Sequence, residues 1–348
     1  MTYRNLSIII GIALASTLTG CLKYEKKANS STTGTMTMVC DNTFRNIMEQ
    51  EIDVFEYQYP DAHVLARYAP QNEALDSLFS LNTRTVVIAR DLTKKERDFL
   101  KSKRRNVKCS KIAVDAVALI VNKDNPCSML TTKEIGDILS GSSTQWNDLE
   151  PSELGKISII FDYAASSLVQ FMRDSLLNGG DLGPNVYAQG SIPAVVETVS
   201  KNVNAIGVLG VTWITSDMKS AELTPEERAM SVISDDPIQG ATLSDDIKVL
   251  KLRRPDEVTA YKPYQQNIFD GTYPLYRPIY MVTTGVSGSL ASGFYTFVTG
   301  DIGQKIILKT GIMPARTRIQ VVQVGQDRHD YPTQIPNIHK TNNNSISQ

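Results

Sequence analysis

The stretch 157-ISIIFDYAASSLVQFMRDSLLNGG-180 contains a strand, a turn and a helix in succession. A β-branched apolar run predicts a buried strand, and the amphipathic helix that follows ends at Asn-Gly-Gly. Ser166 and Ser167 lie where the strand gives way to the helix. Either the serines cap the helix, or their hydroxyls and the free amides of the first turn bind an anion. Spacing alone cannot decide between these roles, although a serine at a helix start is more often a cap than a ligand.

The same strand–turn–helix order recurs along the chain. TMTMVC at 35–40 is followed by DNT and by apolar residues at helical spacing, and 85-TVVIARDLTKKERDFL-100 repeats the pattern. This alternation predicts an α/β fold with largely parallel sheets. Because 348 residues exceed what one core usually holds, we expect two lobes. Two helix starts carry capping boxes, at Thr93–Glu96 and Thr131–Glu134.

The N-terminus has the features of an export signal. Arg4 precedes an apolar run and then small residues, which is typical of a signal peptide over residues 1–20. Leu-Thr-Gly-Cys ending at Cys21 resembles the bacterial lipoprotein processing box, where cleavage leaves a lipidated cysteine. We therefore expect an exported, membrane-anchored lipoprotein, periplasmic or on the cell surface, with a tether over 21–34. The alternative is an ordinary secreted protein with a cysteine there by chance.

Composition argues against several classes of function. A net charge of −1 with 41% hydrophobic residues is ordinary for a globular protein, and we expect no nucleic-acid surface. With three histidines, no HExxH and no Cys-x-x-Cys, the sequence predicts neither a metal site nor a cofactor. The segment 285-GVSG-288 lacks the spacing of a nucleophile elbow and has no obvious histidine partner. We predict that the protein is not an enzyme.

Other parts of the chain leave alternatives open. A disulfide between Cys109 and Cys127 and two free thiols are both compatible with the sequence, whereas Cys40 reads as a small buried residue. The segment 213–271 is irregular, and we expect a loop-rich insertion on the second lobe that includes the strand-like IKVLKL. Residues 325–348 have almost no apolar rhythm and are predicted to be disordered.

Three strand-to-helix turns are rich in polar residues. In parallel sheets such turns lie at the carboxyl ends of the strands, where ligands collect. Two facing lobes that carry these turns would surround a small oxyanion with amide and hydroxyl donors and one guanidinium. The turns are Asp41-Asn42-Thr43, Ala89-Arg90-Asp91 and Ala165-Ser166-Ser167.

The chain resembles the phosphate-type solute-binding proteins of bacterial ABC transporters, which have the two-lobe type II periplasmic-binding-protein fold. The resemblance runs from about Thr35 to Val324. It implies two crossings between the lobes that form a hinge, with lobe one at 35–117 plus 280–324 and lobe two at 118–279. Four stretches in the family order carry it: 113-AVDAVALIVNKDNP-126 with the LTTKEIGDILSGSSTQWNDL that follows, 205-AIGVLG-210, 273-YPLYRPIYM-281 and 302-IGQKIILKTGIMP-314.

The resemblance implies a monomeric binding protein that captures a small inorganic oxyanion, with phosphate favoured, and delivers it to an ABC permease. Asp41, Asn42 and Thr43 fall on the first oxyanion loop of the family, and Ala165, Ser166 and Ser167 on its Ser-Gly-Thr turn.

Two positions depart from the family. Phe161-Asp162 stands where well-known members have an arginine, and Arg90 stands where they have a proton-accepting aspartate. A carboxylate facing an anion is unfavourable, so Asp162 either turns away, pairs with Arg90 or indicates another oxyanion. The alternative function is a surface lipoprotein that uses this fold for adhesion, assembly or sensing.

Overall fold

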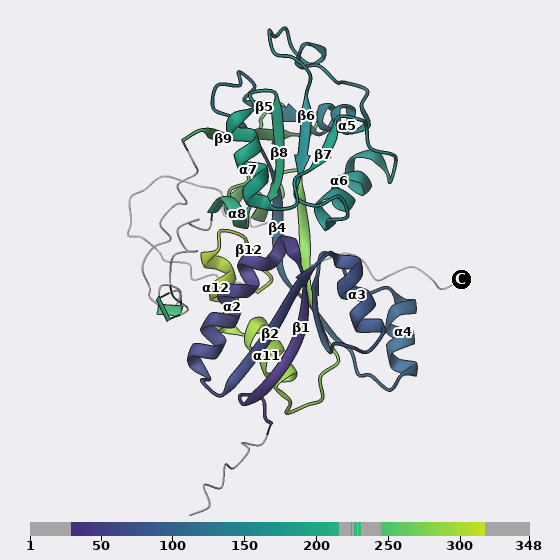
Figure 1. Cartoon of the computed structure of the whole chain (residues 1–348), viewed down its shortest axis with the longest axis vertical. Helices are drawn as coiled ribbons and strands as arrows, with labels where there is room; N and C mark the ends of the chain where they lie inside the picture. The colour runs from purple at the N-terminus through teal and green to yellow at the C-terminus, as the bar shows by residue number, and fades with distance from the viewer. Residues whose placement is uncertain (1–28, 216–223, 225, 228, 231–244, 317–348) are drawn as a thin grey trace, which may run out of the picture. The chain divides into compact units, whose positions relative to one another are not determined.

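The computed structural model describes residues 29–215, 224, 226–227, 229–230 and 245–316 of the chain. The predicted signal peptide, Cys21 and the tail after 325 lie outside these residues. Most strands form one sheet in the order β2-β1-β3-β11-β4-β8-β6-β7. Their bounds in that order are Ala62–Ala69, Gly34–Asp41, Thr85–Ile88, Tyr276–Thr283, Lys108–Asn122, Ala205–Gly210, Ser158–Phe161 and Val186–Ala188. Figure 1 labels β2, β1, β4, β8, β6 and β7 of this sheet.

Strand β4 belongs to both halves of this sheet. Its first part, from Lys108 to Ala116, pairs antiparallel with β11, and its second part, from Val117 to Val121, pairs antiparallel with β8. The second part is buried without interruption. The chain returns beside it, because the Tyr273 hydroxyl donates to the Val117 carbonyl at 2.8 Å. The two halves of the sheet therefore meet where β4 and the chain leading into β11 lie together.

Parallel pairing dominates away from this junction, as predicted. β1 pairs parallel with β2 and β3, and β6 pairs parallel with β7 and β8. The longer helices are α2 (Arg45–Gln58), α3 (Gln71–Phe79), α4 (Lys94–Ser102), α5 (Thr132–Ser140), α6 (Ser167–Leu177), α7 (Ile192–Lys201), α11 (Leu290–Thr299) and α12 (Asp301–Lys309). Shorter helical segments are η1 (Asn42–Phe44), η2 (Trp146–Asp148), α8 (Thr212–Thr215) and α10 (Gln265–Phe269).

Both predicted capping boxes are present. Thr93 accepts from the amide of Glu96 at the start of α4, and Thr131 accepts from the amide of Glu134 at the start of α5. In each pair the glutamate accepts in return from the threonine amide, so two free helix donors are satisfied at once.

The expected insertion is more regular than predicted in its described part. IKVLKL forms two short strands, β9 (Ile247–Val249) and β10 (Lys251–Arg253). β9 pairs with β4 and β10 pairs with β5 (Met129–Thr131), because their apolar residues complete neighbouring cores. The short strand β12 (Met313–Pro314) also pairs with β4. Cys109 and Cys127 are free thiols, and Cys40 is buried as expected.

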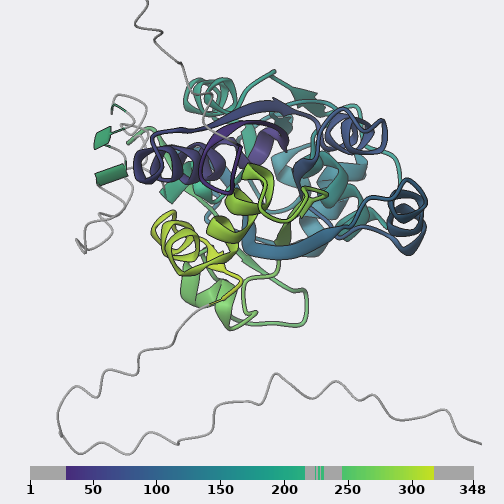
Figure 2. The ribbon, with the colours of Figure 1, turned by 90° about the horizontal axis from the view of Figure 1, so that it is seen from below.

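An aromatic cluster packs helix α2 against helix α11, which is far from it in the sequence. The ring of Phe55 on α2 meets Tyr59, Phe294 and Phe297 edge to face, each at 5.1 Å between centroids. α2 thus packs beside α11 and α12, and these purple and yellow-green helices lie side by side in Figure 2. Within the described part of the chain, no helix is long and apolar enough to cross a bilayer.

We expect Phe55→Ala to destabilise the fold by about 3–5 kcal/mol, because it opens a cavity that three rings line. The measurement is urea unfolding followed by circular dichroism. Tyr57→Ala on the same helix is the control, since Tyr57 is 46% exposed and should cost under about 1 kcal/mol. Equal losses for the two variants would contradict the packing role of Phe55.

Candidate functional site

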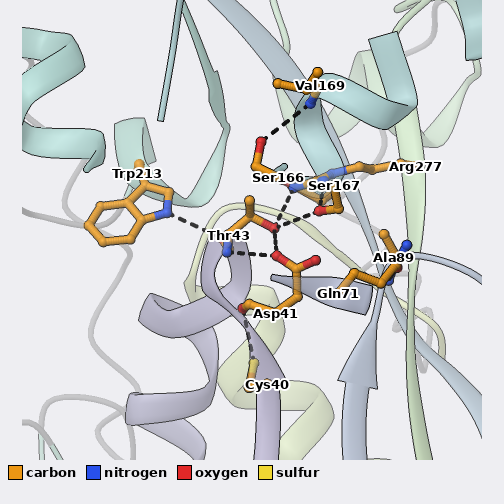
Figure 3. A network of polar contacts seen from close by, with 11 residues as sticks. Cys40, Asp41, Thr43, Gln71, Ala89, Ser166, Ser167, Val169, Trp213 and Arg277 are labelled. Atoms are coloured by element: carbon orange, nitrogen blue, oxygen red, sulfur yellow. Dashed lines mark hydrogen bonds and ion pairs between the residues drawn. The ribbon is translucent and has the colours of Figure 1, made fainter. Parts of the chain in front are cut away.

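Two of the three polar turns meet between the halves of the sheet. β1 ends at Asp41 and leads into η1, while β6 ends at Phe161 and leads into the turn before α6. Ser166 caps α6, because its hydroxyl accepts from the Val169 amide at 3.3 Å. Ser167 does not cap this helix; its hydroxyl lies 3.2 Å from that of Thr43 in the other turn (Figure 3). The two serines thus have different contacts.

Asp41 organises the first turn. Its carboxylate accepts from the Thr43 amide at 2.9 Å and from the Thr43 hydroxyl at 2.7 Å, which caps η1. The Trp213 indole donates to the Thr43 carbonyl at 3.2 Å. Thr43 is therefore fixed through its amide, its hydroxyl and its carbonyl.

The centre of the site is Arg277, which the sequence analysis did not single out. This side chain from β11 is fully buried, with 0% exposure. Its guanidinium donates to the Ser167 hydroxyl at 2.8 Å and to the Thr43 hydroxyl at 3.0 Å (Figure 3). Arg277 therefore joins both turns from β11, the strand that pairs with the shared strand β4.

Two further contacts hold Arg277 in place. Its guanidinium pairs with Asp115 of β4 at 3.2 Å and lies 4.6 Å from the centroid of the Phe44 ring. The available signal was a charged residue in each of two apolar stretches, AVDAVALIV and YPLYRPIYM, which were predicted to cross between the lobes together. Charges in such runs are rarely buried unless they are paired.

The available hydroxyl protons decide which residue donates in the hydrogen bond between Thr43 and Ser167. The only hydroxyl proton of Thr43 goes to Asp41, so Thr43 accepts from both Arg277 and Ser167. Ser167 accepts from Arg277 and donates to Thr43. The chain of bonds therefore starts at the guanidinium and ends on the carboxylate of Asp41.

Three buried carboxylates surround this guanidinium. Asp41, Asp115 and Asp162 are each at most 1% exposed. Burial raises the pKa of Asp115, and Arg277 offsets part of that rise. Burial also raises the pKa of Asp162, and the nearby Ser166 hydroxyl and Tyr163 amide offset part of that rise. Neither contact reaches the geometry of a full hydrogen bond, so both Asp162 oxygens keep acceptor capacity within the described part of the chain. The site therefore has protonatable carboxyl groups beside its cation.

The third turn does not join this network. Arg90 donates to both carboxylate oxygens of Glu96, at 2.9 and 2.7 Å, and the guanidinium bond holds the pKa of Glu96 down at about 2. The pairing of Arg90 with Asp162 that the sequence left open is not formed. Asn42 lies in η1 and Ala165 in the turn before α6, and neither side chain contributes to the network described above. A ligand role for these three residues stays a prediction.

The fold and this junction define a two-lobe α/β binding protein. A family model described as a PBP superfamily domain matches residues 26–301, so the chain belongs to the PBP superfamily. The predicted family resemblance and fold class are confirmed.

Relatives and solved structures agree with this assignment. The chain is 24% identical over 313 residues to the phosphate-binding protein PstS of Pseudomonas aeruginosa, covering 85% of this chain and 87% of that one. It is 23% identical over 268 residues to PstS of Staphylococcus epidermidis, covering 76% and 74%.

Two solved structures share the fold. A phosphate ABC transporter substrate-binding protein from Clostridium perfringens with bound phosphate superposes with a TM-score of 0.63 at 19% identity, covering 81% of this chain and 100% of that one. An ABC-type phosphate transport receptor from Vibrio cholerae gives a TM-score of 0.59 at 18% identity, with the same coverage.

We expect Asp162→Asn to stabilise the unliganded protein at pH 8 and to do so less and less as the pH falls to 4. A carboxyl group whose folded pKa lies above its unfolded pKa contributes stability that is present below the unfolded pKa and lost as pH rises through the folded pKa. Each tenfold difference in proton affinity between the two states corresponds to about 1.4 kcal/mol. Urea unfolding at pH 4, 6 and 8 measures this effect.

Asp174→Asn is the control for this measurement, because Asp174 is exposed on the helix that follows. Its stability should follow that of the wild type at each pH. A loss of stability in Asp162→Asn at pH 8 would mean that the Asp162 carboxylate is stabilised in the folded protein.

Proposed function

We propose that this protein is an exported, lipid-anchored solute-binding protein that captures phosphate between its lobes and delivers it to an ABC permease. The observation that carries the proposal is the double contact of Arg277 with Thr43 and Ser167, one residue from each turn. The relatives are named as phosphate-binding proteins, and a structural neighbour of this fold contains phosphate. Both findings support phosphate as the ligand.

The chemistry of the network suits a tetrahedral oxyanion. Ligand oxygens accept from the Arg277 guanidinium, from the hydroxyls of Thr43 and Ser167 once these rotate, and from free amides at the start of α6. Hydrogen phosphate also carries a hydroxyl of its own. The buried carboxylate of Asp162, whose oxygens keep acceptor capacity, gives that hydroxyl an acceptor, whereas sulfate at neutral pH offers no proton. Asp162 then opposes a fully ionised oxyanion and favours a protonated one.

The hinge follows from the same contacts. We infer a first lobe at 35–117 plus 280–324 and a second at 118–279, with β4 and the chain leading into β11 as the crossings. The pairing of β4 with β11 before Val117 and with β8 after it supports this division. Closing the lobes brings the turns of β1 and β6 together around Arg277. A bound anion replaces the direct contact of Thr43 with Ser167.

We infer a binding role without catalysis. Ser167, the hydroxyl nearest the centre, donates to Thr43 and accepts from a guanidinium, so its contacts in the described structure include no general base. The hydroxyl of Ser166 is used as a helix cap. The same residues serve well as hydrogen-bond donors to an anion.

Arg277→Gln should weaken phosphate affinity about ten- to a hundredfold, because a hydrogen bond to a charged group contributes about 1.5–3 kcal/mol. Titration calorimetry with inorganic phosphate and sulfate measures the change. Arg90→Gln is the matched variant, since the Arg90 guanidinium is held by Glu96 and its loss should leave affinity within about twofold.

A folding control belongs with this measurement, because a lone Asp115 carboxylate would be strongly destabilising. The double variant Arg277→Gln with Asp115→Asn keeps the buried pair neutral and should show the same loss of affinity. If Arg90→Gln loses phosphate affinity while both Arg277 variants bind phosphate normally, the anion binds at the third turn and not at Arg277. No phosphate binding by the folded wild-type protein would refute the proposed ligand.

Cys21→Ser should release the protein from salt-washed membranes, because serine cannot carry acyl chains. Burial of such chains in the bilayer contributes about 0.8 kcal/mol of binding free energy per methylene. Fractionation of expressing cells measures the distribution. Cys127→Ser is the control and should leave the protein with the membranes. Full membrane recovery of Cys21→Ser would reject the lipid anchor.

A further inference from the structure

Cations are concentrated around the end of α4 and the loop after it, in a chain whose net charge is close to zero. No acidic residue occurs between Asp98 and Asp115, whereas lysines and arginines are frequent there. The near-neutral net charge of the whole chain conceals this local concentration of positive charge. We call the following residues the basic patch: Arg84, Lys101, Lys103, Arg104, Arg105 and Lys108.

The cations of the basic patch have no acidic partners among the described residues. Arg84 reaches the Thr284 carbonyl at 3.4 Å, and Lys108 reaches the Ser292 hydroxyl at 3.2 Å. The half-buried Arg105 makes no side-chain hydrogen bond or ion pair in this part of the chain. Elsewhere, exposed cations such as Arg45, Lys133 and Lys201 pair with a glutamate or aspartate on the same helix. The basic patch is thus a place where positive charge is left without a counter-charge.

Two arginines of the basic patch line a cavity of about 340 Å³. Its walls come from the start of β1, the turn before β3, the loop after α4 and the start of α11, and they contain no acidic residue. The volume lies at the lower end of the range for small-molecule sites, which suits a single headgroup. Arg84 and Arg105 are the two charged residues of its lining, so the cavity favours an anionic group such as a phosphate ester.

The cavity lies at the end of the domain that is close to the expected lipid anchor, so the phosphate groups of membrane lipids are the anions within its reach. Thr35, Met36 and Thr37 at the start of β1 line it, whereas β1 ends at Asp41 in the site. Asn29 lines it as well. Asn29 lies eight residues after the expected lipidated Cys21, and that length of chain spans at most about 29 Å. An anchored chain therefore holds this end of the domain within reach of the membrane.

We propose that the basic patch docks the domain onto an anionic lipid surface, with the cavity between Arg84 and Arg105 receiving one lipid phosphate. The proposal rests on the lipid anchor of the proposed function for its geometry, but not on phosphate transport. An acyl anchor and a polybasic surface are complementary signals: acyl chains supply buried area, and each cation near an anionic surface adds attraction. Docking through this end orients the domain and leaves the turns of the binding site, at the other end of β1, uncovered by the lipid surface.

The test uses a chain that starts at residue 21 and carries Cys21→Ser, which keeps every described residue and removes acylation. We expect it to sediment with vesicles of phosphatidylcholine containing one third phosphatidylglycerol, to bind phosphatidylcholine alone far less, and to dissociate at high salt. Neutralising Arg84, Lys103, Arg104 and Arg105 to glutamine should lower the partition coefficient at least about a hundredfold, at roughly fivefold per cation.

A matched variant separates position from total charge. Glutamine at Arg45, Arg67, Lys133 and Lys201 removes as many cations from other surfaces and should change the partition by less than about fivefold. Equal losses in both variants, or equal binding to the two kinds of vesicle, would overturn the proposal. Urea midpoints of both variants check that they fold.

Inorganic phosphate distinguishes a lipid surface from a free-anion site. At constant ionic strength, millimolar phosphate should not release the chain from vesicles, whereas release that depends on Arg84 and Arg105 would make the cavity a site for the free anion and refute lipid docking. Arg277→Gln should keep vesicle binding while losing phosphate affinity, and the basic-patch variant should do the reverse. Failure of the proposed function and failure of this inference are therefore read from different variants.

Discussion

The buried pair of Arg277 and Asp115 is the interaction on which the arrangement of the site depends. Removing both charges from water costs several kcal/mol per ion, and their attraction offsets this only when the remaining donors are satisfied. The guanidinium meets that condition through Asp115, Thr43 and Ser167, which come from three separate segments. The cation therefore cannot be satisfied unless β4, the turn after β1 and the turn after β6 come together. A single side chain thus couples the crossing strands to both halves of the sheet.

The pair also explains how an anion site tolerates so much negative charge. With Asp41, Asp115 and Asp162 all ionised, one guanidinium would face three carboxylates in a water-poor space. Burial raises the pKa of Asp115 and of Asp162, so the ionised form of each carboxyl is disfavoured there and Arg277 offsets part of that cost. A ligand that brings a proton to Asp162 lowers this cost further. In the function that we propose, hydrogen phosphate is that ligand, and Asp162 then favours a protonated oxyanion over sulfate.

Local signals were sufficient for the α/β class and for several helix starts, whereas the two-lobe arrangement was expected from the family resemblance. β-Branched runs, helical periodicity and capping boxes such as Thr131–Glu134 act within a few residues, and the structure contains them as predicted. The site was harder, because contacts between distant residues decide it. Ser167 and Thr43 were found from their turns, but Arg90 has the same local context and is bound by Glu96 six residues later. Arg277 was missed because its hydroxyl partners lie 110 and 234 positions away in the chain.

Arg277 and the basic patch differ in burial and in hydrogen bonding, and these differences suit them to different anions. Arg277 is wholly buried and fully bonded, so its charge acts over short distances on a ligand that excludes water. The basic patch is largely exposed and lacks acidic partners among the described residues, so its field reaches into solvent over about a Debye length. A small anion needs the first arrangement, since affinity there comes from directed bonds. An extended anionic surface needs the second, because many weak attractions add up without fixed geometry.

The eight-residue strand β1 separates the two sites, with the cavity at its first residues and the binding site at its last. Capture at one end therefore does not compete with docking at the other.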